Sequence, residues 1–170
     1  MCEIKEINKR YIDYATYNIW ANNRLITDLT LLNDKLLYKE FVGSFPTICA
    51  TVKHIWYAET IWLSRLKGDG NGAEAVTSFS GDNKALFSQW QATSKNFKEF
   101  TETVDLEKEI QFESKGDNFS IPSREIIQTV FNHGSFHRGQ VVMMLRQLDV
   151  AKIQQTDYIE WVREKARGNI

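Results

Sequence analysis

The sequence predicts an all-α protein built as a single four-helix bundle, with a small hairpin and a short C-terminal helix attached to it. Three observations lead to this fold class: four segments carry apolar residues at helical spacing, the connections between them are polar, and only two prolines interrupt the chain. A chain of 170 residues without a repeat or linker fits one domain, so we expect residues 1–170 to fold together.

The first two helices are expected at about residues 5–32 and 47–67. In the first, apolar residues recur at spacings of three, four or seven, and the polar residue Asn18 falls in the same stripe. The second is apolar around so much of its circumference that most of it should be buried. Glycines at 68, 70 and 72 follow directly, which predicts that the helix stops there.

The third helix is expected at about residues 83–104, where Leu86, Trp90 and Phe97 belong to a stripe with spacings of four and three. Such a stripe is typical of the contact between packed helices. After it, EIQFESKGDNFSIP places two short alternating runs on either side of Lys-Gly-Asp-Asn. This pattern predicts a small hairpin or an irregular excursion.

The fourth long helix is expected to begin near Pro122 and to run to about Leu148, because proline suits a first helical turn. Its inward positions follow steps of four and three residues: Ile126, Val130, His133, His137, Val141, Met144 and Leu148. A short final helix at about residues 156–166, with Thr156 as its N-cap, should pack on the outside.

Composition and charge exclude several classes of protein. The 21 basic and 22 acidic residues give a net charge of -1, which provides no electrostatic excess for nucleic acid or an anionic membrane. No apolar run is long enough for a signal peptide or a membrane span, so we expect a cytoplasmic protein. Cys2 and Cys49 form no CxxC pair and are expected to be reduced thiols, with Cys49 in the core.

Two of the three histidines lie four residues apart in NHGSFHRGQ, residues 132–140. His133 and His137 both fall in the inward stripe of the fourth helix, where each imidazole loses water and needs polar partners. At this spacing both rings project from one face of the helix, so they can bind one metal ion.

The third histidine, His54, lies in the second helix beside the small residues Ala50, Thr51 and Ala58, which would leave room for an ion and a substrate. Three neutral imidazoles without a fourth protein ligand would leave an open coordination position, which is typical of catalytic metal sites. The alternative is that each histidine is an ordinary core residue whose ring hydrogen-bonds to a neighbouring group.

Other metal and cofactor motifs do not fit the sequence. A zinc protease helix would read HExxH, but Gly134 stands where the glutamate belongs. A di-iron carboxylate bundle needs a glutamate three residues before each histidine, and the chain has Val130, Gly134 and Thr51 there. The sequence contains no CxxCH, P-loop or GxGxxG motif for haem or nucleotides.

Three stretches resemble the DinB family of small metal-binding helical proteins. They are YNIWANNRL at 17–25, HIWYAETIWLSRL at 54–66 and HGSFHRGQVVMMLRQL at 133–148, and the resemblance spans about residues 10–165. The second-helix histidine combined with HxxxHRGQ carries most of the specificity. The chain departs from the family at Asp149, where a glycine is usual, and in the following AKIQQTDY, which lacks the usual proline.

The resemblance implies a four-helix bundle, often a homodimer, with a divalent metal ion held by His54, His133 and His137. Nickel and zinc are the metals that it suggests first, with manganese or iron as alternatives. It also implies a small-molecule substrate, because some relatives transfer or use low-molecular-weight thiols such as bacillithiol, mycothiol or glutathione. Neither nucleic acid nor a membrane is expected as a partner.

Two classes of function are consistent with a metal ion held by three histidines. We expect first an enzyme, a metal-dependent transferase that deprotonates a low-molecular-weight thiol for attack on a small electrophile. A hydrolase or isomerase that uses a metal-bound water is the alternative enzyme. The second class is a non-catalytic metal-binding protein of a stress response. The sequence identifies no general base, so no catalytic residue is assigned.

Polar residues near the histidines are expected to have structural roles. Asn18 should be a buried amide satisfied by its neighbours. Glu59 and Glu125 should face solvent, although either carboxylate could accept a hydrogen bond from an imidazole N–H.

The residues that follow His137 are also expected to be structural. Arg138 and Gln140 should point away from the His137 ring and pack or hydrogen-bond between helices. Gly139 should permit close contact with another helix.

Overall fold

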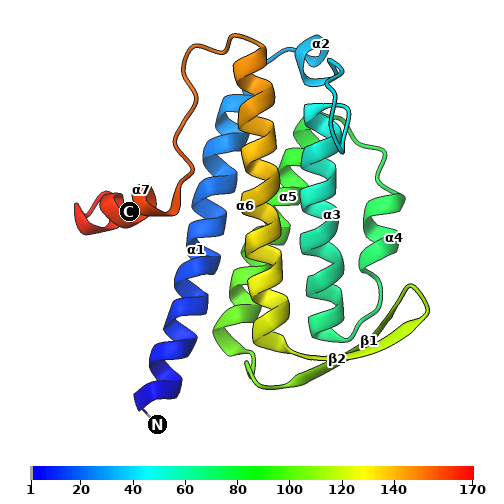
Figure 1. Cartoon of the computed structure of the whole chain (residues 1–170), viewed down its shortest axis with the longest axis vertical. Coiled ribbons are helices and arrows are strands. Elements are labelled where there is room, and N and C mark those ends of the chain that lie inside the picture. The colour runs from blue at the N-terminus through cyan, green and yellow to red at the C-terminus, as the bar shows by residue number, and fades with distance from the viewer. Residues whose placement is uncertain (1) are drawn as a thin grey trace.

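The protein is mostly helical and carries one small antiparallel sheet (Figure 1). A computed structural model describes residues 2–170, and their side chains from residue 8 onward. The elements in chain order are α1 (Cys2–Thr30), α2 (Asp34–Leu37), α3 (Ile48–Lys67), α4 (Gly72–Thr77), α5 (Asn83–Thr103), β1 (Glu109–Ser114), β2 (Asp117–Pro122), α6 (Ser123–Gln147) and α7 (Tyr158–Ala166). The expectation of a mostly helical chain is confirmed.

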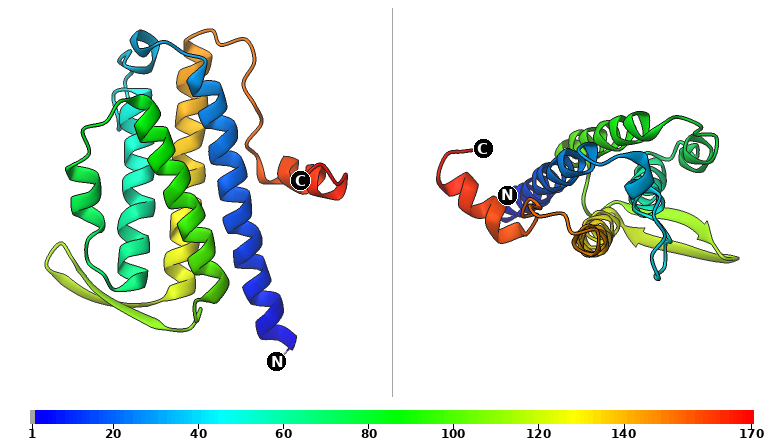
Figure 2. Two further views of the ribbon diagram at one scale, coloured as in Figure 1. Left: turned by 180° about the vertical axis from the view of Figure 1, so that it is seen from behind. Right: turned by 90° about the horizontal axis from the view of Figure 1, so that it is seen from above.

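Four long helices, α1, α3, α5 and α6, run side by side and form the body of the molecule (Figures 1 and 2). Helix α1 packs against α5 and α6, and α3 packs against the same two helices. The arrangement as one four-helix bundle within one domain stays a prediction. Among the described residues, no helix is both long and apolar enough to cross a membrane.

Two separate apolar clusters fill the space between these helices, and each takes residues from all four of them. The first, which we call the Leu145 cluster, includes Leu25 and Leu29 of α1, Ile55 of α3, Trp90 of α5 and Leu145 of α6. The second, the Phe131 cluster, includes Ala15 of α1, Leu63 and Leu66 of α3, Phe97 of α5 and Phe131 of α6. Along every one of the four helices, a short stretch of sequence separates the two clusters.

Local signals explain where the long helices begin and end. The Thr47 hydroxyl accepts a hydrogen bond from the backbone N–H of Ala50 at 3.0 Å and caps the start of α3. Gly68 ends α3 in the left-handed conformation, with φ 75°. The Asp82 carboxylate caps α5 by accepting from the N–H of Ala85 at 2.8 Å. The limits of these helices therefore lie close to those expected from the sequence.

The expected hairpin is present between α5 and α6. Strands β1 and β2 pair antiparallel, with Ser114 opposite Asp117. The two loop residues, Lys115 and Gly116, have φ values of 55° and 86°, as a two-residue hairpin turn of the type I′ kind requires. The hairpin lies across the end of the helices where α3 stops and α6 starts (Figure 1).

Two short helices were not expected, and one cap was misplaced. Helix α2 is a single turn, and α4 begins at Gly72, where the sequence suggested only a helix stop. A Cβ atom at Gly72 would lie 2.7 Å from the Ser64 Cβ, so glycine there permits α4 to approach α3 closely. The N-cap position of α7 is Asp157, not Thr156, whose carbonyl instead accepts a hydrogen bond from the Tyr17 hydroxyl at 2.8 Å.

Cys49 is a buried free thiol, as expected, whereas the side chain of Cys2 lies outside the described residues. The Cys49 thiol donates a hydrogen bond to the Asn83 side-chain oxygen at 3.0 Å. Burial raises the pKa of this thiol to about 11. The thiol therefore stays protonated at neutral pH and is a structural group rather than a nucleophile.

Asp149 follows α6 in the left-handed conformation, with φ 57°. Its N–H donates to the Arg146 carbonyl and the N–H of Val150 donates to the Leu145 carbonyl, the two hydrogen bonds of a Schellman motif.

Since glycine adopts this conformation without steric strain, Asp149→Gly is expected to raise the free energy of unfolding by about 0.5–1 kcal/mol. Urea denaturation with an unchanged m value measures the gain. Asp149→Ala is the control and should lose stability; a glycine variant that is no more stable than wild type would contradict the prediction.

Candidate metal centre

The structure brings the three histidines together on one side of the interface between α3 and α6. His54 comes from α3, and His133 and His137 come from consecutive turns of α6. One ring nitrogen from each histidine lies within 4.8 Å of the other two, and the Nε2 atoms of His54 and His133 are 2.9 Å apart. The spacing of four residues in α6 therefore does place two rings beside a third from another helix.

The dimensions and chemistry of this cluster fit a divalent metal ion. Two nitrogen ligands at 2.0–2.1 Å from a tetrahedral ion lie about 3.3 Å from each other. The Nε2 atoms of His54 and His133 are 2.9 Å apart and all three nitrogens lie within 4.8 Å of one another, so the cluster has about the size that one ion spans. Imidazole nitrogens suit zinc, nickel, copper and iron, so the donor set does not select among these metals.

The surroundings favour the neutral form of the imidazoles. Burial, together with the nearby rings of His137 and His54, lowers the pKa of His133 to about 4. Burial and His137 also lower the pKa of His54. At neutral pH both rings are uncharged and keep a nitrogen lone pair, which is the form that binds a metal ion.

Two phenylalanines cover the cluster. Phe45, in the loop between α2 and α3, stacks on the ring of His54 with centroids 4.1 Å apart and meets the edge of His137 at 5.5 Å. Phe136 of α6 meets His137 at 5.0 Å. His137 is buried, whereas His54 and His133 are half-buried, so the cluster is shielded but remains accessible on the His54 side. Phe45 lies in a loop without periodicity, and no sequence signal indicated it.

Gln140 contacts His137, contrary to the expectation that it points away. The Gln140 side-chain oxygen lies 2.7 Å from Nδ1 of His137. Residues three apart in a helix are neighbours on its surface, which explains the contact. Because an amide oxygen can only accept a hydrogen bond, Nδ1 of His137 carries the proton, and its Nε2 lone pair is free to bind a metal ion.

Removal of this hydrogen bond is expected to weaken metal binding. Gln140→Ala should reduce the affinity for Zn²⁺ by about tenfold or more, because the His137 ring loses the partner that fixes its tautomer and orientation. Competition with a chromophoric chelator measures the affinity. The control is Gln128→Ala on the same helix, whose amide donates to Asn132 at 3.1 Å on an exposed surface. Equal affinities for the two variants would refute the role of Gln140.

Glu59 is buried, and the expectation that it faces solvent is wrong. It is only 1% exposed, and its carboxylate accepts hydrogen bonds from the amides of Asn18 and Asn22 at 2.9 and 3.1 Å and from the Ser94 hydroxyl at 2.7 Å. None of these partners is a histidine. Burial raises the pKa of Glu59, while the three hydrogen bonds and the charge of Arg138 lower it. The expectation for Glu125 is confirmed, since its side chain is exposed.

Arg138 completes a polar layer that crosses all four long helices. Arg138 is 1% exposed, and its guanidinium donates to the side-chain oxygens of Asn18 and Asn22 at 2.7 and 2.8 Å. The same two amides donate to Glu59, so they link the buried cation of α6 to the buried carboxylate of α3. The interhelical role of Arg138 and the buried, satisfied Asn18 are confirmed. We call Asn18, Asn22, Glu59, Ser94 and Arg138 the polar layer; it separates the Leu145 cluster from the Phe131 cluster.

Close packing at the polar layer depends on Gly134 rather than on Gly139. A Cβ atom at Gly134 would lie 3.0 Å from Nη1 of Arg138 and 3.3 Å from Oδ1 of Asn18. A Cβ atom at Gly139 would meet nothing within 4 Å, so the expectation of close helix contact there is wrong. Gly134, one residue after His133, provides the space that the Arg138 side chain occupies.

A pocket adjoins the histidine cluster. It has a volume of about 480 Å³ and is lined by Phe45, Ala50, Lys53, His54, Tyr57, Val76 and Thr77. Of the three small residues expected beside His54, only Ala50 lines it, since Thr51 and Ala58 are buried.

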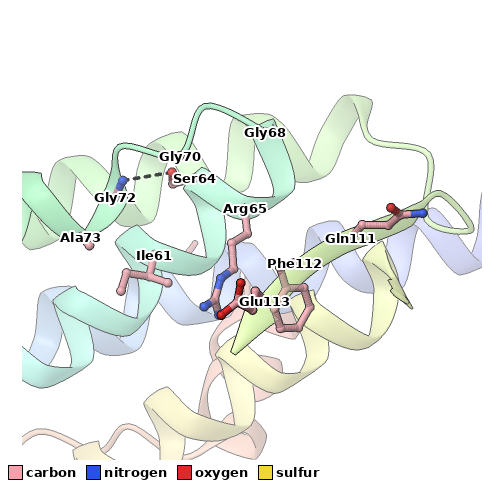
Figure 3. A pocket seen from close by; sticks show the side chains of 10 residues that line it. All are labelled: Ile61, Ser64, Arg65, Gly68, Gly70, Gly72, Ala73, Gln111, Phe112 and Glu113. Carbon is pink, nitrogen blue, oxygen red and sulfur yellow. Dashed lines mark hydrogen bonds between the residues drawn. The ribbon is translucent and has the colours of Figure 1, made fainter. Parts of the chain in front are cut away.

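A second pocket, of about 400 Å³, lies between the end of α3, the loop before α4 and strand β1 (Figure 3). Its lining includes Ser64, Arg65 and Glu113. Ser64 follows His54 by ten residues, or about 15 Å along the helix. None of the three histidines lines this pocket, so it is separate from the candidate metal centre.

Comparison with known proteins identifies the family and agrees with the fold. The family model described as "DinB family" matches residues 1–166. Protein DinB of Bacillus subtilis strain 168 is 27% identical over 161 residues, which cover 84% of this chain and 87% of that protein.

Solved structures of DinB-like proteins have a similar fold. One from Bacillus subtilis superposes with a TM-score of 0.59 at 12% identity and covers 89% of this chain and 98% of its own. One from Bacillus cereus ATCC 10987 gives 0.61 at 20% identity and covers 82% and 91%. At these identities the likeness concerns the fold alone. The family match spans nearly the whole sequence, and the chain therefore belongs to the DinB family.

Proposed function

We propose that His54, His133 and His137 hold a divalent metal ion, and that the protein is a transferase that activates a low-molecular-weight thiol for attack on a small electrophile. The observation that carries the proposal is the convergence of three imidazole nitrogens within 4.8 Å beside a pocket. Membership of the DinB family supports a metal-associated function. Nickel or zinc is the ion expected first, with manganese or iron as alternatives.

The charge of the donor set supports a thiol as the substrate. The cluster consists of imidazoles without a carboxylate, so the ligands leave the charge of a divalent ion uncompensated and favour an anion beside it. When bound, such an ion lowers the pKa of a thiol or water that approaches its open position.

The surrounding residues support the same chemistry through their own contacts. Gln140 holds the His137 ring by its Nδ1 proton, and Phe45 excludes water from one face of His54. His54 also lines the adjoining pocket, where a small molecule can lie beside the cluster. Hydrolysis or isomerisation would use the same three ligands and is the alternative reaction.

A non-catalytic, structural ion is the alternative from another class. Structural zinc sites are closed by four protein ligands. Within the described residues, only three histidines meet at this cluster, and an open pocket lies beside them. These two observations favour a reactive site over a structural one.

The proposal is tested in two steps. Metal content is first measured on protein purified without a polyhistidine tag or nickel resin. The metal-loaded protein is then assayed with bacillithiol, glutathione, cysteine and coenzyme A against a bimane electrophile. We expect conjugation with at least one thiol that a chelator abolishes. If none of the four thiols is conjugated in a metal-dependent way, the transferase hypothesis is rejected. The hydrolase, isomerase and non-catalytic alternatives would then remain.

We also propose that the four long helices form a single four-helix bundle within one domain, that the protein is a homodimer and that it works in the cytoplasm. The packing of α1 and α3 against both α5 and α6 and the fold similarity to DinB-like structures support the bundle. The family resemblance supports the dimer. Sedimentation equilibrium would test the dimer directly, since a single species with the mass of one chain would contradict it.

A further inference from the structure

The pocket beside His54 lies between α3, α4 and the loop that carries Phe45. Four of its lining residues, Ala50, Lys53, His54 and Tyr57, follow one another in α3 at spacings of three, one and three. These spacings place them along one face of the helix. His54 therefore belongs both to the histidine cluster and to the wall of the pocket.

The walls of the pocket are mainly apolar, with one cationic group. Phe45, Tyr57 and Val76 contribute aromatic and aliphatic surface. The hydroxyl of Thr77 donates to the backbone carbonyls of its own helix, so it is already satisfied. Lys53 is the one charged side chain in the lining besides the titratable His54.

The Lys53 ammonium is available to a ligand. In the part of the chain that the structure describes, no ion pair or side-chain hydrogen bond involves Lys53. The ammonium makes a cation–π contact with Phe79, whose ring centroid lies 5.8 Å from Nζ. Asp82 lines a neighbouring pocket together with Lys53, but its carboxylate caps α5. A half-buried cation without an anionic partner favours an anion in the adjoining space.

The size of the pocket restricts its occupant to a small molecule. About 480 Å³ lies within the range of roughly 300–1,000 Å³ that small-molecule sites have, and an apolar wall with one polar anchor is their usual composition. A macromolecule is not favoured, because the lining comes from a short stretch of two helices and one loop.

We propose that this pocket binds a small organic acid, with its carboxylate on Lys53 and its apolar body between Phe45, Tyr57 and Val76. This part of the inference rests on the proposed function: the end of the molecule opposite the carboxylate reaches His54, where the reaction takes place. Lys53 is then a specificity-determining residue that selects carboxylate-bearing substrates over neutral ones of the same shape.

The test uses the metal-free protein and two probes of equal shape, 3-phenylpropionate and neutral 3-phenylpropionamide. Each probe is titrated into ¹⁵N-labelled protein, and the amide resonances of Lys53, Val76 and Thr77 are followed. We expect both probes to shift these resonances, with the acid binding about two- to fivefold more tightly, as one half-exposed ion pair allows. Lys53→Met should abolish the preference, and Lys53→Glu should reverse it toward the amide.

The matched control is Lys67→Met, an exposed lysine at the other end of α3, which should leave the preference unchanged. Equal affinities of the two probes for the wild-type protein would overturn the proposal. Shifts confined to other parts of the chain, or a preference that survives Lys53→Met, would also overturn it.

The experiments distinguish a failure of the organic-acid proposal from a failure of the proposed transferase function. The titration needs no metal ion and no thiol, so it can succeed even if the metal-loaded protein transfers nothing. Conversely, metal-dependent thiol transfer together with equal affinity for the acid and the amide would uphold the reaction and reject the role of Lys53.

Discussion

Replacement of Arg138 by methionine is expected to lower the free energy of unfolding by about 3–5 kcal/mol. The substitution removes the cation of the polar layer and leaves the carboxylate of Glu59 buried without a compensating charge. It also leaves the side-chain oxygens of Asn18 and Asn22 without the donor that they now share. Unpaired buried polar groups carry their full desolvation penalty. Urea denaturation of metal-free protein measures the loss.

Two further variants separate the buried cation from a general effect of the substitution. Arg146→Met changes an exposed arginine of the same helix and should leave stability almost unchanged. The double variant Arg138→Met with Glu59→Met removes both buried charges and should be less destabilised than the sum of the two single variants. Additive losses would show that Arg138 and Glu59 are not coupled, and a loss below about 1 kcal/mol for Arg138→Met would contradict the expected penalty.

His137→Ala is expected to abolish metal binding. The alanine removes the one cluster histidine that is buried and held by Gln140. Loss of a direct ligand should exceed the effect of its hydrogen-bonding partner, so the affinity should fall by roughly a hundredfold or more. Metal analysis after extensive dialysis measures the content per chain, and circular dichroism checks that the helices remain.

The neighbouring residue provides the control for this variant. Phe136→Ala removes a larger, 64% exposed side chain beside the same ring and should retain the metal ion. Unchanged metal content in His137→Ala would exclude the proposed site. If His137→Ala loses the metal and is as stable as the metal-loaded wild-type protein, a purely structural ion is excluded as well.

Periodicity was sufficient to predict the long helices and to place His133 and His137 on the inward face of the last one. The stripe of α6 placed His133 and His137 on the core side, and burial of Val130, His137 and Val141 agrees with it. The alternating runs on either side of Lys-Gly-Asp-Asn likewise predicted the hairpin, and the structure identifies Lys115 and Gly116 as its two turn residues.

The polar contacts could not be predicted in the same way. Glu59 reads as a surface charge in sequence, because its three hydrogen-bonding partners come from α1 and α5, and a helical pattern does not show which polar groups will meet. Asn22 and Ser94 were missed for the same reason. Gln140 is different: its position three residues after His137 was visible, and local helix geometry alone could have indicated the contact.

The polar layer has a consequence for the alignment of the helices. Apolar clusters tolerate a helix that slides along its neighbour, since one aliphatic contact can replace another. A slide of α6 by one turn, about 5.4 Å, would carry the Arg138 guanidinium out of reach of Asn18 and Asn22 and into one of the two apolar clusters. Such a shifted packing is penalised by an unpaired charge. The five residues of the polar layer thus fix the axial register of α6 relative to α3. The position at which His54 meets His133 and His137 therefore depends on side chains outside the histidine cluster.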